Sequence, residues 1–374
     1  MIEIDLNAPT IPPDQRVWRL FPGSGYQFLE DFREQRVGFL DVPGFEIPEG
    51  KFEDAKDLVA RVAQSQHIRD FLWSQGPEAK PRVPLAEFAR SRATQGRTRI
   101  ANAASNFFEE AKKGDFVVLP EPTFLSTIWV GRFADNRTVK AFFPRRYGKT
   151  AVPARNIRWL GSYPENTIST PLSRALRHQH PFTLLEKSLH LEVFALAYGS
   201  FVYKDHFAAT VYNDKRDFLD ADGALLGAIS RLSAAALRSM DNGEDGISDA
   251  DLADILLRNP PIEYTCTQQV DIHSPGFTRY TAATAVALVI SAVAAGLIGL
   301  AEHSSADNIA EDLPKMVVTN TASDADPLCT AMVSEASARI VKALGTDRTW
   351  ALCKDAREAQ HRAGLRSSAV PRKK

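Results

Sequence analysis

A stretch of 22 residues without a charged side chain, Tyr280 to Ala301, constrains the fold of this chain more than any other feature. Its sequence is YTAATAVALVISAVAAGLIGLA, with Arg279 immediately before it and Glu302 immediately after it. An apolar helix of about 20 residues can cross a bilayer, and the same helix can form the buried centre of a globular domain. The chain must therefore either place this segment in a membrane or surround it with protein.

The composition of this segment leaves both possibilities open. Its length and flanking charges favour a membrane helix, but only eight of the 22 residues are Leu, Ile or Val. Each of these contributes about −0.3 to −0.6 kcal/mol at a helix centre, so insertion is marginal. The small-residue pairs Ala292/Gly296 and Ala295/Gly299 suit helix association in a membrane, and they equally suit close packing in a bundle or a homo-oligomer. If the segment spans a membrane, the charges on its two flanks predict that the residues before it lie in the cytoplasm. They would then be tethered to the inner face of the membrane.

The cysteines and the first residues indicate where the chain folds. Cys266, Cys329 and Cys353 lie far apart and form no CxxC pair, so neither a disulfide framework nor a zinc knuckle is expected. The opening MIEIDLNAPTIPPDQRV lacks the apolar core of a secretory signal. A reduced, cytosolic setting is therefore expected.

Charge is distributed unevenly, although the net charge is only −1. Between Arg90 and Leu160 there are fourteen Lys and Arg against five Asp and Glu, whereas Leu300 to Thr330 holds six acids and Lys315 alone. A region that carries nine excess positive charges attracts polyanions, and a solvated surface would have the same composition.

The pattern of apolar residues predicts an α+β protein. The runs VWRLF, VGFLDV, DFVVLP, STIWVGRF, TVKAFFP and NIRWLGSY have the character of short strands, and amphipathic helices are expected at 52–73 and up to Gly114. Short strands separated by Pro, Gly and Asn turns and preceded by one or two helices are typical of a small, partly open β-barrel. From Ser169 onward, helical patterns predominate.

Four motifs in one order also support this prediction. A helix ending in KKGD is followed by FVVLP, IWVGRF and IRWL, and the chain opens this region with VWRLFPGSG and VGFLDV. This order resembles the PUA-like superfamily, especially its EVE-like and restriction-associated modified-base reader domains, over roughly residues 16–188. The resemblance implies an N-terminal PUA-like small β-barrel with flanking helices, followed by a mostly α-helical C-terminal region with an Ala-rich apolar helix at 280–301. We expect a reader domain at 1–168, an α-rich connecting domain at 169–274 and a C-terminal region with a basic tail at 275–374.

The resemblance also implies a function. PUA-like and EVE-like domains bind nucleic acids or single nucleobases, and several restriction-associated ones hold a modified base that is flipped from the duplex into an aromatic pocket. In this chain the rings expected to stack on a base are Trp18, Phe21, Tyr26, Phe39, Phe45 and Trp129, with Asp41 or Asn102 for the base edge. The cations expected to contact phosphates are Arg19, Arg97, Arg99, Arg145, Arg146 and Lys149. Restriction-type readers point to antiviral (phage) defence as the context.

Three residues of the motifs are expected to shape the scaffold. Gly114 can adopt the left-handed conformation that ends a helix, and the Asp115 carboxylate can hold the following turn. Gly131 allows a close approach to its strand.

Signs of an active site are missing from the sequence. It contains no GxxxxGK[ST] loop, no GxSxG elbow and no convincing D…ExK pair, and its histidines lack metal-ligand spacing. We therefore predict a non-catalytic recognition protein without metal or cofactor. The alternative is a metal-dependent nuclease or hydrolase whose ligands come from scattered acids, Asp205, Asp214, Asp220 and Asp222. A further alternative is an assembly or adaptor protein that has lost its ligand.

Overall fold

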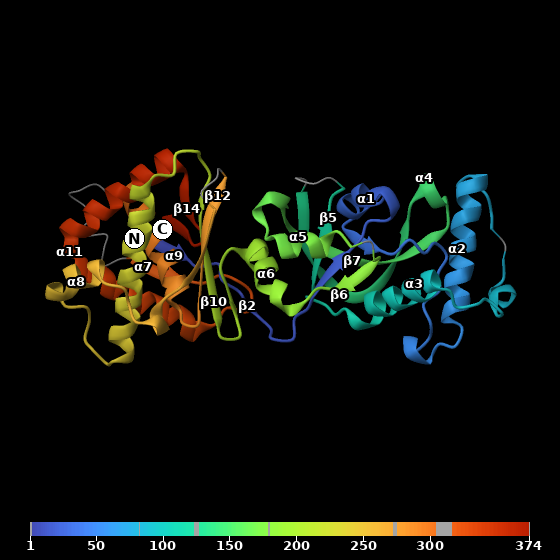
Figure 1. The fold of residues 1–374 in the computed structure, drawn as a ribbon, viewed down its shortest axis with the longest axis horizontal. Coiled ribbons are helices and arrows are strands. Elements are labelled where there is room, and N and C mark those ends of the chain that lie inside the picture. Colours follow the sequence, from blue (N-terminus) through green and yellow to red (C-terminus); the bar gives the residue numbers. More distant parts are fainter. Residues whose placement is uncertain are drawn as a thin grey trace. The chain divides into compact units, whose positions relative to one another are not determined.

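The structure is a computed structural model, and it describes residues 2–81, 83–122, 127–178, 180–271, 275–303 and 316–373. The chain divides into two compact units, and each has its own hydrophobic core. Unit 1 comprises Met1–Pro13 and Tyr198–Lys374, and unit 2 comprises Asp14–Ala197 (Figure 1).

Unit 2 combines one six-stranded sheet with helices. Its strands are β3 (Val17–Leu20), β4 (Val37–Phe39), β5 (Phe116–Pro120), β6 (Thr127–Phe142), β7 (Ala151–Pro164) and β8 (Phe182–Leu184). Its helices are α1 (Leu29–Glu34), α2 (Leu58–Gln75), α3 (Gln95–Ser105), α4 (Pro144–Tyr147), α5 (Thr170–Leu176) and α6 (His190–Tyr198), which ends at the unit boundary. A π-helical turn, Asn106–Glu110, extends α3 toward the KKGD turn.

The sheet of unit 2 is open, so the prediction of a PUA-like β-barrel is wrong. Its strand order is β4-β7-β6-β5-β3-β8, with β3 parallel to β5 and the other pairs antiparallel. A barrel needs its two edge strands to pair, but β4 and β8 are three residues long and lie at opposite edges of this order. The runs STIWVGRF and TVKAFFP, predicted as separate strands, form the single strand β6, which is interrupted by bulges at Val130/Gly131 and Phe133/Thr138.

Aromatic rings fill the core of unit 2. The Phe39 ring contacts Phe32 and Phe143 edge-on or tilted at centroid distances of 4.5 and 4.4 Å, and it contacts Phe28 at 5.0 Å. These contacts join α1 and the residue before it to β4 and to the residue that precedes α4. Large rings in edge-to-face contact bury much apolar area with few residues, which stabilises a small open sheet.

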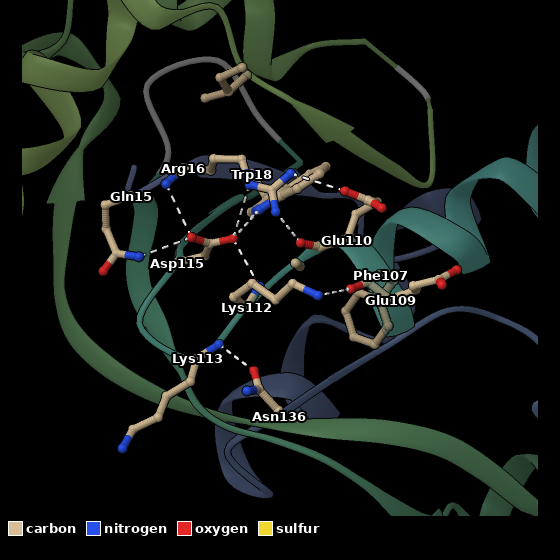
Figure 2. A network of polar contacts seen from close by, with 12 residues as sticks. Gln15, Arg16, Trp18, Phe107, Glu109, Glu110, Lys112, Lys113, Asp115 and Asn136 are labelled. Atoms are coloured by element: carbon tan, nitrogen blue, oxygen red, sulfur yellow. Dashed lines mark hydrogen bonds and ion pairs between the residues drawn. The ribbon is translucent and has the colours of Figure 1, made fainter. Parts of the chain in front are cut away.

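The KKGD turn is held by the buried carboxylate of Asp115 (Figure 2). Its Oδ1 accepts from Gln15 Nε2 at 3.0 Å and from the backbone N–H of Arg16 at 3.1 Å. Its Oδ2 accepts from Trp18 Nε1 and from the backbone N–H of Lys112, both at 2.9 Å. Because these donors belong to the start of β3 and to the end of the preceding helix, one carboxylate ties the two segments together. Asp115 is therefore part of the scaffold.

The two glycines of the motifs are also needed for packing. Gly114 has φ of +87°, and a Cβ atom there would lie 2.8 Å from both Arg132 and Gln15 side chains. A Cβ at Gly131 would lie 2.7 Å from the side chains of Ile157 and Trp159 on the neighbouring strand β7. Both distances are shorter than any normal contact, so only glycine fits without a shift of its neighbours.

Unit 1 contains two sheets and four helices within its described residues. Its strands are β1 (Ile2–Asp5), β2 (Thr10–Ile11), β9 (Phe201–Tyr203), β10 (His206–Asn213), β11 (Thr267–Asp271), β12 (Gly276–Ala282), β13 (Met316–Thr319), β14 (Leu365–Ser367) and β15 (Val370–Lys373). Its helices are α7 (Asp220–Asp241), α8 (Leu252–Leu257), α9 (Val286–His303) and α11 (Pro327–Ala363). The sheets have the orders β13-β1-β15 and β11-β12-β10-β9-β2, with β14 also paired to β10, and both mix parallel and antiparallel pairs. The α+β class is thus confirmed.

The apolar segment forms a strand end and a buried helix. Tyr280–Ala282 belong to β12, and α9 begins only at Val286. α9 lies among α7, α11 and the strands of unit 1, and every residue from Val286 to Ala301 is buried (Figure 1). α9 is long and apolar enough to cross a membrane, but 89% of it is buried inside the structure. Its length and composition are therefore weak evidence for a span, because the core helix of a soluble protein has the same properties.

Candidate nucleic-acid interface

Three of the six rings expected to stack on a base are core residues. Trp18, Phe39 and Phe45 are 2%, 1% and 5% exposed. The Trp18 ring stacks on Phe182 at a centroid distance of 4.7 Å, and its N–H is used by Asp115. In this structure these rings cannot meet a ligand from solvent.

The other three rings are partly exposed, but they do not form one cage. Phe21 and Tyr26 contact each other edge-on at 5.2 Å beside η1 (Ser24–Tyr26). Trp129, in β6, donates from Nε1 to Glu121 at 3.0 Å and lies under the guanidinium of Arg33 at 4.2 Å. Asn102, expected at a base edge, is exposed on α3.

Two arginines of unit 2 stabilise the fold from inside. Arg19 is fully buried and donates to the backbone carbonyls of His178 and His180. Arg155 is 1% exposed and donates to the carbonyls of Phe107 and Ala111 at 2.8 and 2.7 Å. Burial lowers the pKa of each guanidinium to about 10. Because these charges are desolvated and used by carbonyls, they add little to the attraction of a polyanion.

The remaining cations expected at phosphates lie in separate surroundings. Arg97 donates to Gln66 of α2 at 3.2 Å, while Arg99 is exposed on the same helix, α3. Arg145 and Arg146 lie in α4, and Lys149 follows that helix. Arg145 and Lys149 are exposed, and neither has a hydrogen bond or ion pair among the described residues.

A half-buried carboxylate, Asp41, connects α4 to α2. Its Oδ1 accepts from the hydroxyl of Tyr147 in α4, and its Oδ2 lies 3.8 Å from the guanidinium of Arg69 in α2. Burial raises the pKa of Asp41, although the Tyr147 hydrogen bond and the charges of Arg69 and Arg146 oppose the shift. The same burial and the neighbouring Asp41 charge raise the pKa of Tyr147. Among the residues expected in the base pocket, Asp41 lies beside a predicted phosphate contact, Arg146, and Phe21 lies beside another, the buried Arg19.

Arg146 fixes the orientation of α4. Its guanidinium donates to the Gln27 Oε1 atom at 2.9 Å, lies 3.8 Å from Asp31 Oδ2 and covers the ring of Phe28 at 5.0 Å. α4 is therefore anchored on its Arg146 side, and Arg145 next to it is left exposed to solvent.

The ring best placed for stacking, Trp73, is not among those predicted from the sequence. Trp73 is 50% exposed near the end of α2, and the Arg69 guanidinium lies 5.2 Å from its ring centroid. The turn after α4 packs closely on the residues after α2, since a Cβ at Gly148 would lie 1.9 Å from the carbonyl oxygen of Pro77. Figure 1 accordingly shows α4 beside α2, and the two helices are in contact.

These contacts define one surface, which we call the α2/α4 surface. It consists of Trp73 and four cations, Arg69, Arg145, Arg146 and Lys149. An exposed ring beside arginines and a lysine can stack on an unpaired base and contact its phosphates. The i,i+4 spacing of Arg69 and Trp73 was the signal available in the sequence, because both must lie on the same face of a helix.

The acids of the alternative hydrolase are not assembled into a site. Asp222 is buried and paired with Arg362, and Asp214 is paired with Arg366 at 2.6 Å. Asp205 and Asp220 are exposed, and Asp220 lies in the first turn of α7. Within the described ranges no group of three or more His, Cys, Asp or Glu side chains has the arrangement of a metal site.

Comparisons with known proteins do not add to this picture. No protein-family model matches the chain, and searches of curated proteins and of solved structures found no match. The resemblance to EVE-like readers thus stays a prediction from the motifs.

Proposed function

We propose that unit 2 binds single-stranded nucleic acid through the α2/α4 surface. The observation that carries the proposal is the half-exposed Trp73, whose ring centroid lies 5.2 Å from the Arg69 guanidinium. Its helix, α2, contacts α4, which carries the exposed Arg145 and is followed by the exposed Lys149. Stacking on one open ring is sequence-tolerant and needs an unpaired base, which favours single strands over an intact duplex.

The charge of the unit supports the same proposal. Residues 14–197 contain 27 Lys and Arg against 21 Asp and Glu, a net charge of +6. A positive field increases the rate of encounter with a polyanion, and contacts to phosphates release counterions. Three acids, Asp31, Asp41 and Asp70, lie beside the surface, and Asp70 accepts from Arg69 at 3.0 Å. Burial raises the pKa of Asp31 and of Asp41. Their proximity to the arginines fixes the positions of these cations.

Fluorescence anisotropy with labelled oligothymidine tests the proposal in the full chain. Trp73→Ala should weaken binding about tenfold, because a stacked base contributes roughly 1–3 kcal/mol, and Trp73→Phe should restore most of the affinity. Arg145→Ala/Lys149→Ala should reduce the slope of log K against log salt by about 1.4, since each phosphate contact to a single strand contributes about 0.7.

The matched control removes two exposed cations from unit 1, Arg216→Ala/Lys342→Ala. It changes the net charge equally and should leave both affinity and salt slope unchanged. Equal affinity for wild type and Trp73→Ala, together with an unchanged salt slope in Arg145→Ala/Lys149→Ala, would exclude the α2/α4 surface as the binding site.

The burial of α9 supports a role for this helix in the core of unit 1, with unit 2 acting as a cytoplasmic reader. Tethering to the inner face of a membrane stays a prediction, and it would require unit 1 to open around α9. Membrane fractionation with an alkaline carbonate wash distinguishes the two arrangements. A core helix predicts wild-type protein in the soluble fraction and misfolded Leu288→Arg, because that substitution buries a charge. Wild-type protein that resists the wash would support the tether.

A further inference from the structure

Unit 1 contains a cavity of about 400 Å³ between α7 and the chain from Glu244 to Pro261. Its volume lies within the range of small-molecule sites, which runs from roughly 300 to 1,000 Å³. The residues around it differ from those of the α2/α4 surface, and they belong to unit 1 alone.

Two arginines that line this cavity have no anionic partner among the described residues. Arg231 and Arg238 lie two turns apart on α7, and within the described ranges neither side chain has a hydrogen bond or an ion pair. Many other arginines of unit 1 are paired with acids, namely Arg258 with Asp254, Arg339 with Glu335, Arg362 with Asp222, Arg366 with Asp214 and Arg372 with Asp5. Unit 1 has 25 Asp and Glu against 18 Lys and Arg, so partners for Arg231 and Arg238 are plentiful in its composition. Two unpaired guanidinium groups beside a cavity are therefore suited to an anionic ligand.

The cavity wall is fixed by a third arginine from another helix. Arg339 of α11 donates from Nη1 to the hydroxyl of Ser239 at 3.1 Å and to the backbone carbonyl of Glu244 at 2.6 Å. Its guanidinium is held in turn by Glu335 at 2.7 Å. These contacts join the end of α7 to the start of the opposite wall, so α11 links the two segments that line the cavity.

The remaining lining has an apolar part and a carboxylate part. The apolar part consists of Ala234, Ala235, Ile247, Ile255, Pro260 and Pro261. The acids Glu244, Asp251 and Asp254 also line the cavity, and Asp254 is the one paired with Arg258. Apolar side chains suit a planar ring, and free carboxylate oxygens accept hydrogen bonds from ring amino groups.

We propose that this cavity binds a nucleotide. Arg231 and Arg238 would hold its phosphate, Ile247 and Ile255 would contact the base, and Asp251 would accept from an amino group of the base. Inorganic phosphate satisfies only the arginines, and a sugar phosphate leaves the apolar wall uncovered. A nucleotide has the anion, the ring and the N–H donors that this lining requires.

Isothermal titration calorimetry on the full chain tests the proposal with AMP, GMP, CMP and UMP as probes, and with ribose 5-phosphate and inorganic phosphate as references. At least one nucleotide should bind, at least tenfold more tightly than either reference. Arg231→Ala/Arg238→Ala should lower that affinity at least tenfold. Ala235→Trp, which fills the cavity without a change in charge, should abolish binding.

Two controls distinguish nucleotide binding in this cavity from a non-specific effect of charge and from binding at the α2/α4 surface. Arg216→Ala/Arg357→Ala removes two exposed arginines elsewhere in unit 1, and Trp73→Ala removes the ring of unit 2. Both should bind the nucleotide as the wild type does. The proposal is overturned if no nucleotide binds, if the references bind as tightly, or if folded Arg231→Ala/Arg238→Ala and Ala235→Trp both retain wild-type affinity.

Discussion

Unit 1 packs its core around a helix rich in alanine and glycine, whereas unit 2 packs its core around phenylalanine rings. In unit 1 a Cβ at Gly296 would lie 2.8 Å from Met316, and one at Gly299 would lie 2.7 Å from Pro371, so α9 approaches β13 and β15 closely. In unit 2 the rings hold a sheet whose edges stay open. The difference shows that one chain of ordinary composition can combine a core that depends on small residues with one that depends on large ones.

The charges of the two units also differ in sign. Unit 2 carries a net +6 and unit 1 a net −7, which together give the −1 of the chain. A polyanion is therefore expected to meet unit 2 and to be repelled by most of unit 1. Arg231 and Arg238, which have no ion pair among the described residues, are a local exception. Their cavity accommodates a small anion, whereas a long polyanion is repelled by the acidic surroundings.

The largest expected effect on either core is that of Asp115→Ala in unit 2. The substitution leaves the buried N–H groups of Trp18 and Gln15 and two backbone N–H groups without their acceptor. At about 1–3 kcal/mol for each group that stays buried and unsatisfied, the unfolding free energy of unit 2 should fall by roughly 4 kcal/mol. Urea unfolding followed by tryptophan fluorescence measures the loss. Asp115→Asn, which keeps one acceptor oxygen, should lose less, and an equal loss would show that the carboxylate network is not the cause.

A smaller loss is expected for Gly299→Leu in unit 1. The added side chain must displace Pro371, and overpacking of this kind costs about 1–3 kcal/mol. The matched control is Gly223→Leu on α7, where no atom lies within 4 Å of an added Cβ, and its stability should be unchanged or slightly higher. Thermal unfolding of both variants compares the two sites. If Gly299→Leu were as stable as the control, the close packing of α9 against β15 would be contradicted.

The smallest effect is a change in pH dependence at Asp41 in unit 2. Because burial raises the pKa of Asp41 in the folded state, the folded protein binds this proton more tightly than the unfolded chain does. The contribution of Asp41 to stability is therefore complete below the unfolded pKa of about 3.9 and is lost as the pH rises through the raised folded pKa. In Asp41→Asn the stability should no longer decrease as the pH rises through this range. Urea midpoints measured across the acidic range compare the variant with the wild type. An unchanged pH profile would argue against the raised pKa.

The local features of the fold could be predicted from sequence because neighbouring residues determine them. The strands at Val17 and Val37 follow from short apolar runs between turns, and the Gly114-Asp115 turn follows from backbone sterics and one short polar side chain. The features that depend on distant partners could not be predicted. β1 pairs with β13 and β15, so Ile2 lies opposite Met316 and Lys373, and nothing near Ile2 in the sequence indicates either partner.

The candidate site shows the same limit. All four residues of β3 are buried, so alternation could not tell whether Trp18 faces a pocket or the core. The run of uncharged residues hid the boundary between β12 and α9, because apolar strands and apolar helices have the same composition. Trp73 was missed because its exposure depends on how α2 packs against the rest of unit 2. The packing of Gly148 on Pro77, which brings α4 to the end of α2, joins residues that are far apart in the sequence.

Hydrogen–deuterium exchange of the full chain with and without oligothymidine shows directly whether the α2/α4 surface binds single strands. We expect slower exchange in unit 2 over the end of α2 and the turn that follows it, residues 69–80, and over α4 and its flanks, residues 142–150. Peptides of α7, α9 and α11 in unit 1 should exchange unchanged. Protection confined to unit 1, or no protection at a saturating oligonucleotide concentration, would contradict binding at this surface.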